Sequence, residues 1–152
     1  TVQSLLATPA VERQVALSPD GRWLAYISDE SGRYEVYVRP FPDTKKSKQQ
    51  VSVNGGFTPR WSRDGRELFF ADETHVLYSV PVAPGPVFTP GVPTRLFEAF
   101  AYNVLVLQFE PHPDGRRFLM ARSVGSELQR PDELVLVQNF FEELKAKVPG
   151  NK

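Results

Sequence analysis

A short phrase built on Asp-Gly-Arg occurs three times and limits how this chain can fold more than any other feature. It stands in "LSPDGRWLAY", "WSRDGRELFF" and "EPHPDGRRFLM", in which the aspartates are Asp20, Asp64 and Asp114. These aspartates lie 44 and 50 residues apart, which matches repeats of roughly 40 to 50 residues and not the shorter helical repeats. The phrase therefore predicts one structural unit that is repeated along the chain.

The residues between the copies indicate that this unit is made of strands. Apolar residues alternate or cluster in short runs, such as "RWLAYIS", "ELFFA" and "RRFLMARS", without the 3.6-residue spacing of a helix. Turn-forming Gly, Pro, Asn and Asp residues separate the runs. With the observed period, the pattern predicts an all-β fold: a β-propeller of four-stranded antiparallel blades, three blades per chain, which is half a propeller.

The repeat also sets the expected boundaries of a single partial propeller domain that spans the chain. Blade one is expected at about 14–53, blade two at about 57–99, and blade three at about 105–139 without its outer strand. Residues 2–7 have the pattern of an outer strand belonging to another blade. Residues 140–147 predict a short C-terminal helix, because acidic residues come first and lysines last.

The repeated phrase has the chemistry of a hairpin turn. In the first copy Pro19 presets its φ angle, Asp20 can accept hydrogen bonds from the backbone that follows, and Gly21 can take a positive φ. An alternative is a Ca²⁺ site, but each copy offers one aspartate where such a site needs several oxygen ligands. We therefore assign a structural role in turns to six residues: Asp20, Gly21, Asp64, Gly65, Asp114 and Gly115.

The stretches "SPDGRWLAYISDESGRYEVYVRPFP", "GGFTPRWSRDGRELFF" and "PDGRRFLMAR" resemble the TolB-type, WD-repeat-like β-propellers. Together with the closing "ELVLVQNFFEELK", the chain is similar to the C-terminal sensor region of bacterial serine/threonine protein kinases that end in such a propeller. The resemblance implies a sensor or protein-interaction module of a larger signalling protein, with a periplasmic or extracytoplasmic location. The kinase motifs themselves do not occur in the sequence, so phosphoryl transfer is not expected.

Composition and motifs favour a non-catalytic role. The sequence has no Cys, 18 basic and 18 acidic residues, and no apolar run near the roughly 20 residues of a membrane-spanning helix. We therefore expect no nucleic-acid partner, no membrane insertion of this segment and no cofactor. The two histidines, His75 and His112, lack the spacing of metal ligands, and no Gly-x-Ser-x-Gly motif occurs.

Any ligand is expected at the mouth of the central channel, where the innermost strands of a propeller converge. Arg60 and Glu110 occupy equivalent positions, four residues before their turn aspartates, and Ala16 is the third member of the set. His112 lies beside the third turn. Arg60, Glu110 and His112 are therefore the candidate contacts for a protein or peptide ligand; the alternative is that they only solvate the channel.

Two other functions stay open at this stage. The chain could be a propeller accessory domain of a serine peptidase or other hydrolase, which flanking sequence would reveal. It could also be a propeller hydrolase with carboxylates clustered around Glu110 in the channel.

The number of blades leads to an expectation about assembly. Three blades cannot close a ring, because propellers have about four to eight. We expect a homodimer that closes a six-bladed ring, in which residues 2–7 of each chain complete the third blade of its partner. The alternative is half of a longer single-chain propeller.

Overall fold

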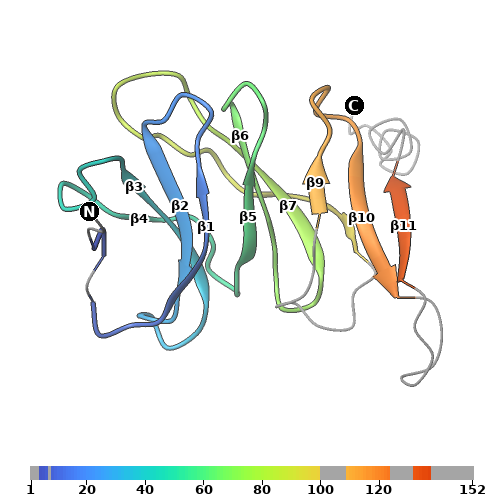
Figure 1. Cartoon of the computed structure of the whole chain (residues 1–152), viewed down its shortest axis with the longest axis horizontal. Coiled ribbons are helices and arrows are strands. Elements are labelled where there is room, and N and C mark those ends of the chain that lie inside the picture. Colours follow the sequence, from blue (N-terminus) through green and yellow to red (C-terminus); the bar gives the residue numbers. More distant parts are fainter. Residues whose placement is uncertain (1–3, 7, 100–108, 124–131, 138–152) are drawn as a thin grey trace, which may run out of the picture.

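The computed structural model describes residues 4–6, 8–99, 109–123 and 132–137 of the 152-residue chain. Within these residues, eleven strands form three antiparallel sheets that follow one another from the N-terminal to the C-terminal side of the molecule (Figure 1). The predicted all-β class and the four-stranded antiparallel sheets are confirmed.

Each sheet is built from strands that are consecutive in the sequence. The first sheet contains β1 (Glu12–Leu17), β2 (Trp23–Ser28), β3 (Glu35–Pro40) and β4 (Gln49–Gln50). The second contains β5 (Phe57–Trp61), β6 (Glu67–Ala71), β7 (Val76–Pro81) and β8 (Thr94–Glu98). The third contains β9 (Phe109–Pro111), β10 (Phe118–Ser123) and β11 (Asp132–Val137).

The second strand of each sheet is apolar on both faces, which allows the sheets to stack. In β2 the residues Trp23, Ala25 and Ile27 point to one face, and Leu24 and Tyr26 lie between them in the sequence. All five are buried. Because successive side chains of a strand point to opposite faces, such a run is expected for a strand covered on both sides.

Two apolar cores join the three sheets. The first core lies between the first and second sheets and includes Trp23, Ile27, Trp61, Leu68 and Phe70. The second core joins the second and third sheets through a separate set, which includes Phe69, Leu77, Leu96, Phe109, Phe118 and Met120. The middle sheet therefore buries both of its faces.

The long connection between β7 and β8 returns over the first core. Figure 1 shows this loop, residues 82–93, arching towards the first sheet beside the upper ends of β1 and β2. The Phe88 ring lies between two tryptophans, with ring centroids 5.5 Å from Trp23 and 6.2 Å from Trp61. Arg22 Nη1 also donates to the Gly85 carbonyl over 2.8 Å. The loop thus ties the first two sheets together.

A buried carboxylate holds the connection between the first and second sheets. Glu35 is 1% exposed, and its Oε1 accepts a hydrogen bond from the Gly55 amide over 3.0 Å. Its Oε2 accepts from the Ser52 hydroxyl, and Arg33 Nε lies 3.5 Å from Oε1. The Gly56 amide donates to the Tyr34 carbonyl over 2.9 Å. These contacts fix where the chain leaves one sheet and enters the next.

The N-terminal segment is described at residues 4–6 and again from residue 8. Residues 4–6 of the expected 2–7 strand lie in no strand. Instead, the Leu5 carbonyl accepts a hydrogen bond of 2.6 Å from the Thr44 hydroxyl, in the connection between β3 and β4. This contact places Leu5 beside the first sheet, and the assignment of residues 2–7 to an outer strand of another blade stays a prediction.

Other expectations fall partly outside the described residues. The predicted helix at 140–147 lies wholly outside them, and within the described part of the chain no helix occurs. Blade three was expected to begin at about residue 105; residues 105–108 lie outside the described residues, and the first described strand of this sheet is β9. The described strands of the third sheet number three, in the order β11-β10-β9.

Candidate binding site at the inner strands

The Asp-Gly turns fix the ends of β1, β5 and β9, which we call the inner strands. In the first turn, the Ser18 hydroxyl donates to Asp20 Oδ1 over 2.7 Å and accepts a hydrogen bond from the Trp23 amide over 2.9 Å. Asp20 Oδ1 also accepts the Arg22 amide at 3.1 Å. Gly21 has a φ of 71°, which a side chain would oppose. The buried serine therefore links both strands of the hairpin to the turn aspartate.

The second turn repeats this arrangement. Ser62 Oγ donates to Asp64 Oδ1 over 2.7 Å and accepts the Glu67 amide over 2.9 Å. Gly65 has a φ of 70°, close to the value in the first turn. Because the same atoms are joined in both copies, the turn and the strand that precedes it have one shared local geometry.

In the third turn a histidine replaces the serine. His112 Nδ1 lies 3.3 Å from the Asp114 amide nitrogen and 3.1 Å from Asp114 Oδ1. Arg117 Nε donates to Asp114 Oδ2 over 2.8 Å, and its Nη2 lies 3.0 Å from His112 Nε2. Gly115 keeps the positive φ, at 67°. The third turn thus has the same backbone shape as the others but a different set of side-chain contacts.

These hydrogen bonds favour the charged form of the turn aspartates. The Ser18 hydroxyl lowers the pKa of Asp20, and the Ser62 hydroxyl lowers the pKa of Asp64 in the same way. The hydrogen bond from the Arg116 amide, helped by His112 and Arg117, lowers the pKa of Asp114 to about 2. All three carboxylates are therefore ionised at neutral pH.

Two inner strands carry a β-bulge at the same place in the repeat. Gln14 in β1 and Thr58 in β5 each lie six residues before their turn aspartate, and their φ angles are 51° and 53°. Such values are uncommon for residues other than glycine and are most unfavourable for a β-branched one such as Thr58. Gln14 Oε1 accepts the Thr58 amide over 2.7 Å, so the two bulges are hydrogen-bonded to each other across the first and second sheets.

The structure brings together two of the three residues predicted as ligand contacts. Arg60 Nε, on β5, lies 3.6 Å from Glu110 Oε2, on β9. Arg60 Nη1 also donates to the Pro59 carbonyl over 2.9 Å. The Arg60 side chain is 33% exposed and that of Glu110 is 71% exposed. The pair therefore joins the inner strands of two neighbouring sheets while a large part of it stays open to solvent.

His112 has a different setting from that pair. It lies at the turn end of β9, and its recorded contacts are with Asp114 and Arg117 in its own turn. The bulges and the Arg60–Glu110 pair lie further along the inner strands. The Arg60 guanidinium is a positively charged hydrogen-bond donor, and the Glu110 carboxylate is a negatively charged acceptor. Such a pair suits the recognition of polar groups on a ligand.

The other histidine lies in the turn between β6 and β7. Asp72 Oδ1 accepts hydrogen bonds from the Thr74 amide, the Thr74 hydroxyl and the Val76 amide, and the Tyr78 hydroxyl donates to Oδ2. Burial, with Asp72 beside it, raises the pKa of Tyr78. His75 Nε2 is buried and has no hydrogen-bond partner among the described residues. In that part of the chain no cluster of three or more His, Cys, Asp or Glu could hold a metal ion.

Sequence reasoning missed two groups of residues. Ser18 and Ser62 precede their aspartates by two positions, and this repeated Ser-x-Asp-Gly spacing was a signal that could have identified them. The bulges at Gln14 and Thr58 lay at equivalent positions, but nothing in a Gln or a Thr predicts a positive φ.

Comparison with solved structures relates this geometry to known folds. The chain superposes on a TolB from Agrobacterium tumefaciens with a TM-score of 0.59 and 17% sequence identity, covering 88% of this chain and 47% of that one. It also matches TolB from Acinetobacter baumannii, with a TM-score of 0.46, 14% identity and coverage of 88% and 42%. The β-propeller domain of the Trilobed protease from Pyrococcus furiosus matches with a TM-score of 0.39, 13% identity and coverage of 84% and 55%.

The first of these matches shows a TolB-like β-propeller fold, and at 17% identity it shows the fold alone. The chain spans about half the length of the solved structures that it matches. Neither a protein-family model nor a curated protein sequence matches the chain. No helix in the described residues is long and apolar enough to cross a membrane.

Proposed function

We propose that this chain is a non-catalytic binding module, part of a β-propeller, that recognises a protein or peptide at the inner strands. The observation that carries the proposal is the exposed ion pair between Arg60 on β5 and Glu110 on β9. A peptide offers carbonyl oxygens, amide hydrogens and charged ends, and the pair places a donor and an acceptor for such groups side by side.

The bulges support the same function. Backbone strain of this kind costs about 1–3 kcal/mol per residue and persists where the surrounding structure enforces it, often at functional sites. Gln14 and Thr58 hold this conformation in two neighbouring inner strands and bond to each other. Inner strands fixed in this way would meet a ligand without first rearranging, which favours binding.

A selection experiment tests the proposal. A phage-displayed library of random peptides is selected against the full chain, and the enriched peptides are measured by biolayer interferometry against Arg60→Ala, Glu110→Ala and the control Arg63→Ala. Arg63 is exposed and lies outside the pair. We expect at least about tenfold weaker binding to the first two variants and unchanged binding to the control. Enriched peptides that bind all variants equally would contradict the proposed site.

The absence of catalysis is tested separately. A panel of peptidase, esterase and glycosidase substrates should show no turnover by the chain. Turnover that is abolished in Glu110→Gln would overturn the non-catalytic assignment and favour a hydrolase with its active site at the inner strands.

We further propose that the module belongs to a larger signalling protein. The support is the resemblance of its turn and strand motifs to the C-terminal propellers of bacterial serine/threonine protein kinases. The sequence of the full gene tests this directly: an upstream kinase domain would support it, and an adjoining α/β-hydrolase domain would favour the alternative of a peptidase accessory domain.

A further inference from the structure

The position of a residue relative to the turn aspartate of its sheet indicates on which face of the sheet its side chain lies. In the second sheet, the residues four and six positions after Asp64 are Leu68 and Phe70, which pack against the first sheet. The residue five positions after it, Phe69, packs against the third sheet. We call the side that packs against the preceding sheet the leading face, and the opposite side the trailing face.

The third sheet follows the same rule. Four and six positions after Asp114 are Phe118 and Met120, which pack against the second sheet. Inner-strand residues obey it as well. Trp61 lies three positions before its aspartate, packs towards the first sheet and donates from Nε1 to the Ala16 carbonyl over 3.2 Å. The repeat therefore identifies which side chains of the second and third sheets face the sheet before them.

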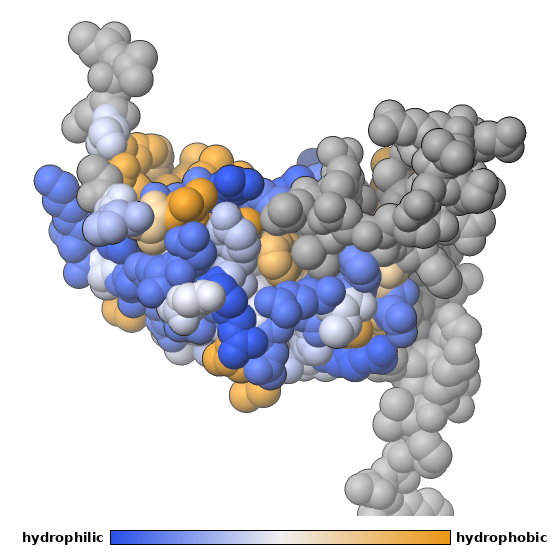
Figure 2. All heavy atoms as spheres, turned by 90° about the horizontal axis from the view of Figure 1, so that it is seen from below, coloured by the Kyte–Doolittle hydropathy of each residue, from blue (hydrophilic) through white to orange (hydrophobic). Residues whose placement is uncertain are grey.

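The leading face of the first sheet is buried on β2, where Leu24 and Tyr26 are 6% and 1% exposed, but it is uncovered along the inner strand β1. Leu17 occupies the position of Trp61 and is 48% exposed, whereas Trp61 is 8% exposed. Val15 occupies the position of Phe109 and is 64% exposed, whereas Phe109 is 3% exposed. In Figure 2, apolar spheres gather towards the end of the molecule that carries the first sheet.

The trailing face of the third sheet is exposed to solvent at Leu119. Leu119 lies five positions after Asp114 and is 44% exposed, while its equivalents Ala25 and Phe69 are both fully buried by the sheet that follows. Apolar side chains are thus exposed at both ends of the described stack, at positions that the repeat buries elsewhere. Exposed apolar surface of this kind indicates an interaction site.

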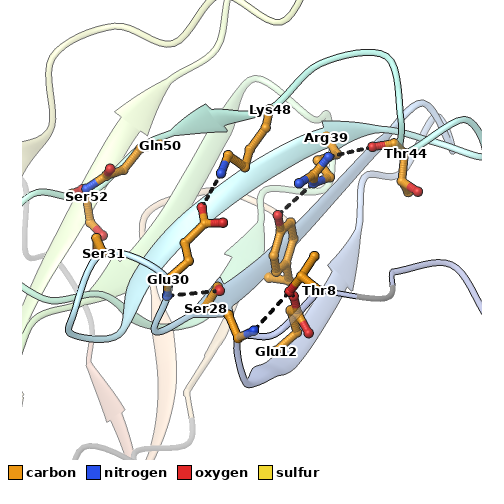
Figure 3. Close-up of polar contacts among 12 residues, drawn as sticks. Thr8, Glu12, Ser28, Glu30, Ser31, Arg39, Thr44, Lys48, Gln50 and Ser52 are labelled. Carbon is orange, nitrogen blue, oxygen red and sulfur yellow. Dashed lines mark hydrogen bonds and ion pairs between the residues drawn. The ribbon is translucent and has the colours of Figure 1, made fainter.

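The polar side chains around the leading face already have partners. Figure 3 shows Lys48 paired with Glu30, Arg39 reaching the Thr44 carbonyl, and Thr8 beside Glu12. Below them, Arg39 Nε donates to the Tyr26 hydroxyl over 2.7 Å. A partner that covers Val15 and Leu17 would therefore bury no unpaired charge from this group of side chains, and burial of unpaired charge is the main cost of covering a charged surface.

We infer that the leading face of the first sheet binds the trailing face of the third sheet of a second copy of this chain. The observed interfaces join a leading face to a trailing face, and among the described residues the third sheet carries a trailing face that is exposed at Leu119. Two copies related by a two-fold axis would make this contact twice, and three sheets from each would give a ring of six, within the usual four to eight. The contact does not depend on exchange of residues 2–7, because its apolar residues lie on β1 and β10.

The test compares variants of the full chain by light scattering coupled to size-exclusion chromatography at micromolar concentrations. We expect the wild type to have the mass of a dimer, and Val15→Asp and Leu119→Asp each to have half that mass. The matched control is Val87→Asp, because Val87 is 69% exposed but lies in the loop between β7 and β8; it should stay dimeric. Circular dichroism should show all four proteins folded.

Mixing the two interface variants tests the arrangement itself. In each variant alone, both contacts of the ring carry one aspartate. In a mixed dimer one contact carries both aspartates and the other carries none, so we expect mixing to restore association. Failure of that rescue would overturn the leading-to-trailing arrangement, as would a Leu119→Asp variant that stays dimeric. A folded wild-type monomer would overturn the inference and favour coverage by further sheets of a longer chain, and open-ended polymers would overturn the closed ring.

Discussion

At the scale of single residues, the repeated phrase acts through the side chain that stands two positions before its aspartate. Ser18 and Ser62 each join the turn carboxylate to the backbone of the returning strand. His112 takes this position in the third copy and bonds differently. The Asp-Gly pair was identifiable from its recurrence, and its conformation followed from the known preferences of Gly and Asp. The role of the serine depends on a contact between strands, which the turn residues alone do not reveal.

Replacing Ser62 by Ala should destabilise the fold by about 1 kcal/mol, because the partly buried Glu67 amide would lose its acceptor. Urea unfolding followed by circular dichroism measures this change. Ser47→Ala is the matched control, since Ser47 is exposed in the connection between β3 and β4, and it should change stability little. Equal unfolding midpoints for the two variants would contradict the role given to Ser62.

The turn aspartates also predict how stability depends on pH. Their pKa values in the folded chain lie below the ordinary 3.8, so the unfolded chain binds protons at a higher pH than the folded chain does. The ionised turn aspartates therefore stabilise the folded chain fully above about pH 4. This contribution is lost as the pH falls, and for Asp114 it is lost as the pH passes about 2.

Urea midpoints measured between about pH 6 and about pH 2 should fall steeply at the acidic end. Asp114→Asn should make this fall shallower, because the residue no longer titrates. Asp43→Asn, in the connection after β3, should leave the slope as it is in the wild type. A slope that is the same in all three proteins would rule out the turn carboxylate as its source.

At the scale of elements, the loop at residues 82–93 does more than connect two strands. Phe88 lies between Trp23 and Trp61, and Gly85 accepts a hydrogen bond from Arg22 of the first turn. The sequence between Pro81 and Pro93 is rich in proline, a composition that is typical of a loop. Which sheet the loop would cover could not be predicted, because that depends on the placement of residues more than 60 positions earlier.

Phe88→Ala should destabilise the chain by about 3–5 kcal/mol, since it would leave a cavity beside two large rings. The neighbouring Val87→Ala should change stability by less than about 0.5 kcal/mol, because Val87 is exposed. Chemical unfolding of both variants provides the comparison. If the two substitutions had similar effects, the loop would not contribute to the core as the structure indicates.

At the scale of the whole molecule, the three sheets are built alike, and they are held together by two apolar cores and by short connections. The period of the aspartates and the alternation of the runs were enough to predict antiparallel sheets of four strands. They could not predict the path of the N-terminal segment, because the apolar pattern of residues 2–7 fits a strand equally well on any blade, and the Thr44 contact that holds Leu5 arises only in the folded chain. The Arg60–Glu110 pair was predictable as two equivalent positions, but not as a contact between neighbouring inner strands.

The connection through Gly55 and Gly56 sets how the first two sheets are placed. A Cβ atom at Gly56 would fall on Ser52 Oγ and within 2.8 Å of Val36 Cγ2, both in the packed junction. Gly56→Ala should therefore destabilise the chain by about 1–3 kcal/mol through overpacking. Gly91→Ala is the control, because its Cβ would meet Pro81 at an ordinary 3.4 Å. Thermal melts of the two variants should differ clearly; coincident melts would mean that the junction can expand.

The position of Phe88 gives the protein a natural optical probe. Both tryptophans of the sequence, Trp23 and Trp61, contact this one ring. The second core, by contrast, is lined by phenylalanines such as Phe69, Phe109 and Phe118. Tryptophan fluorescence excited near the red edge of its absorption would thus report the opening of the first junction while remaining blind to the second. A difference between that signal and the far-ultraviolet signal during unfolding would reveal the order in which the sheets separate.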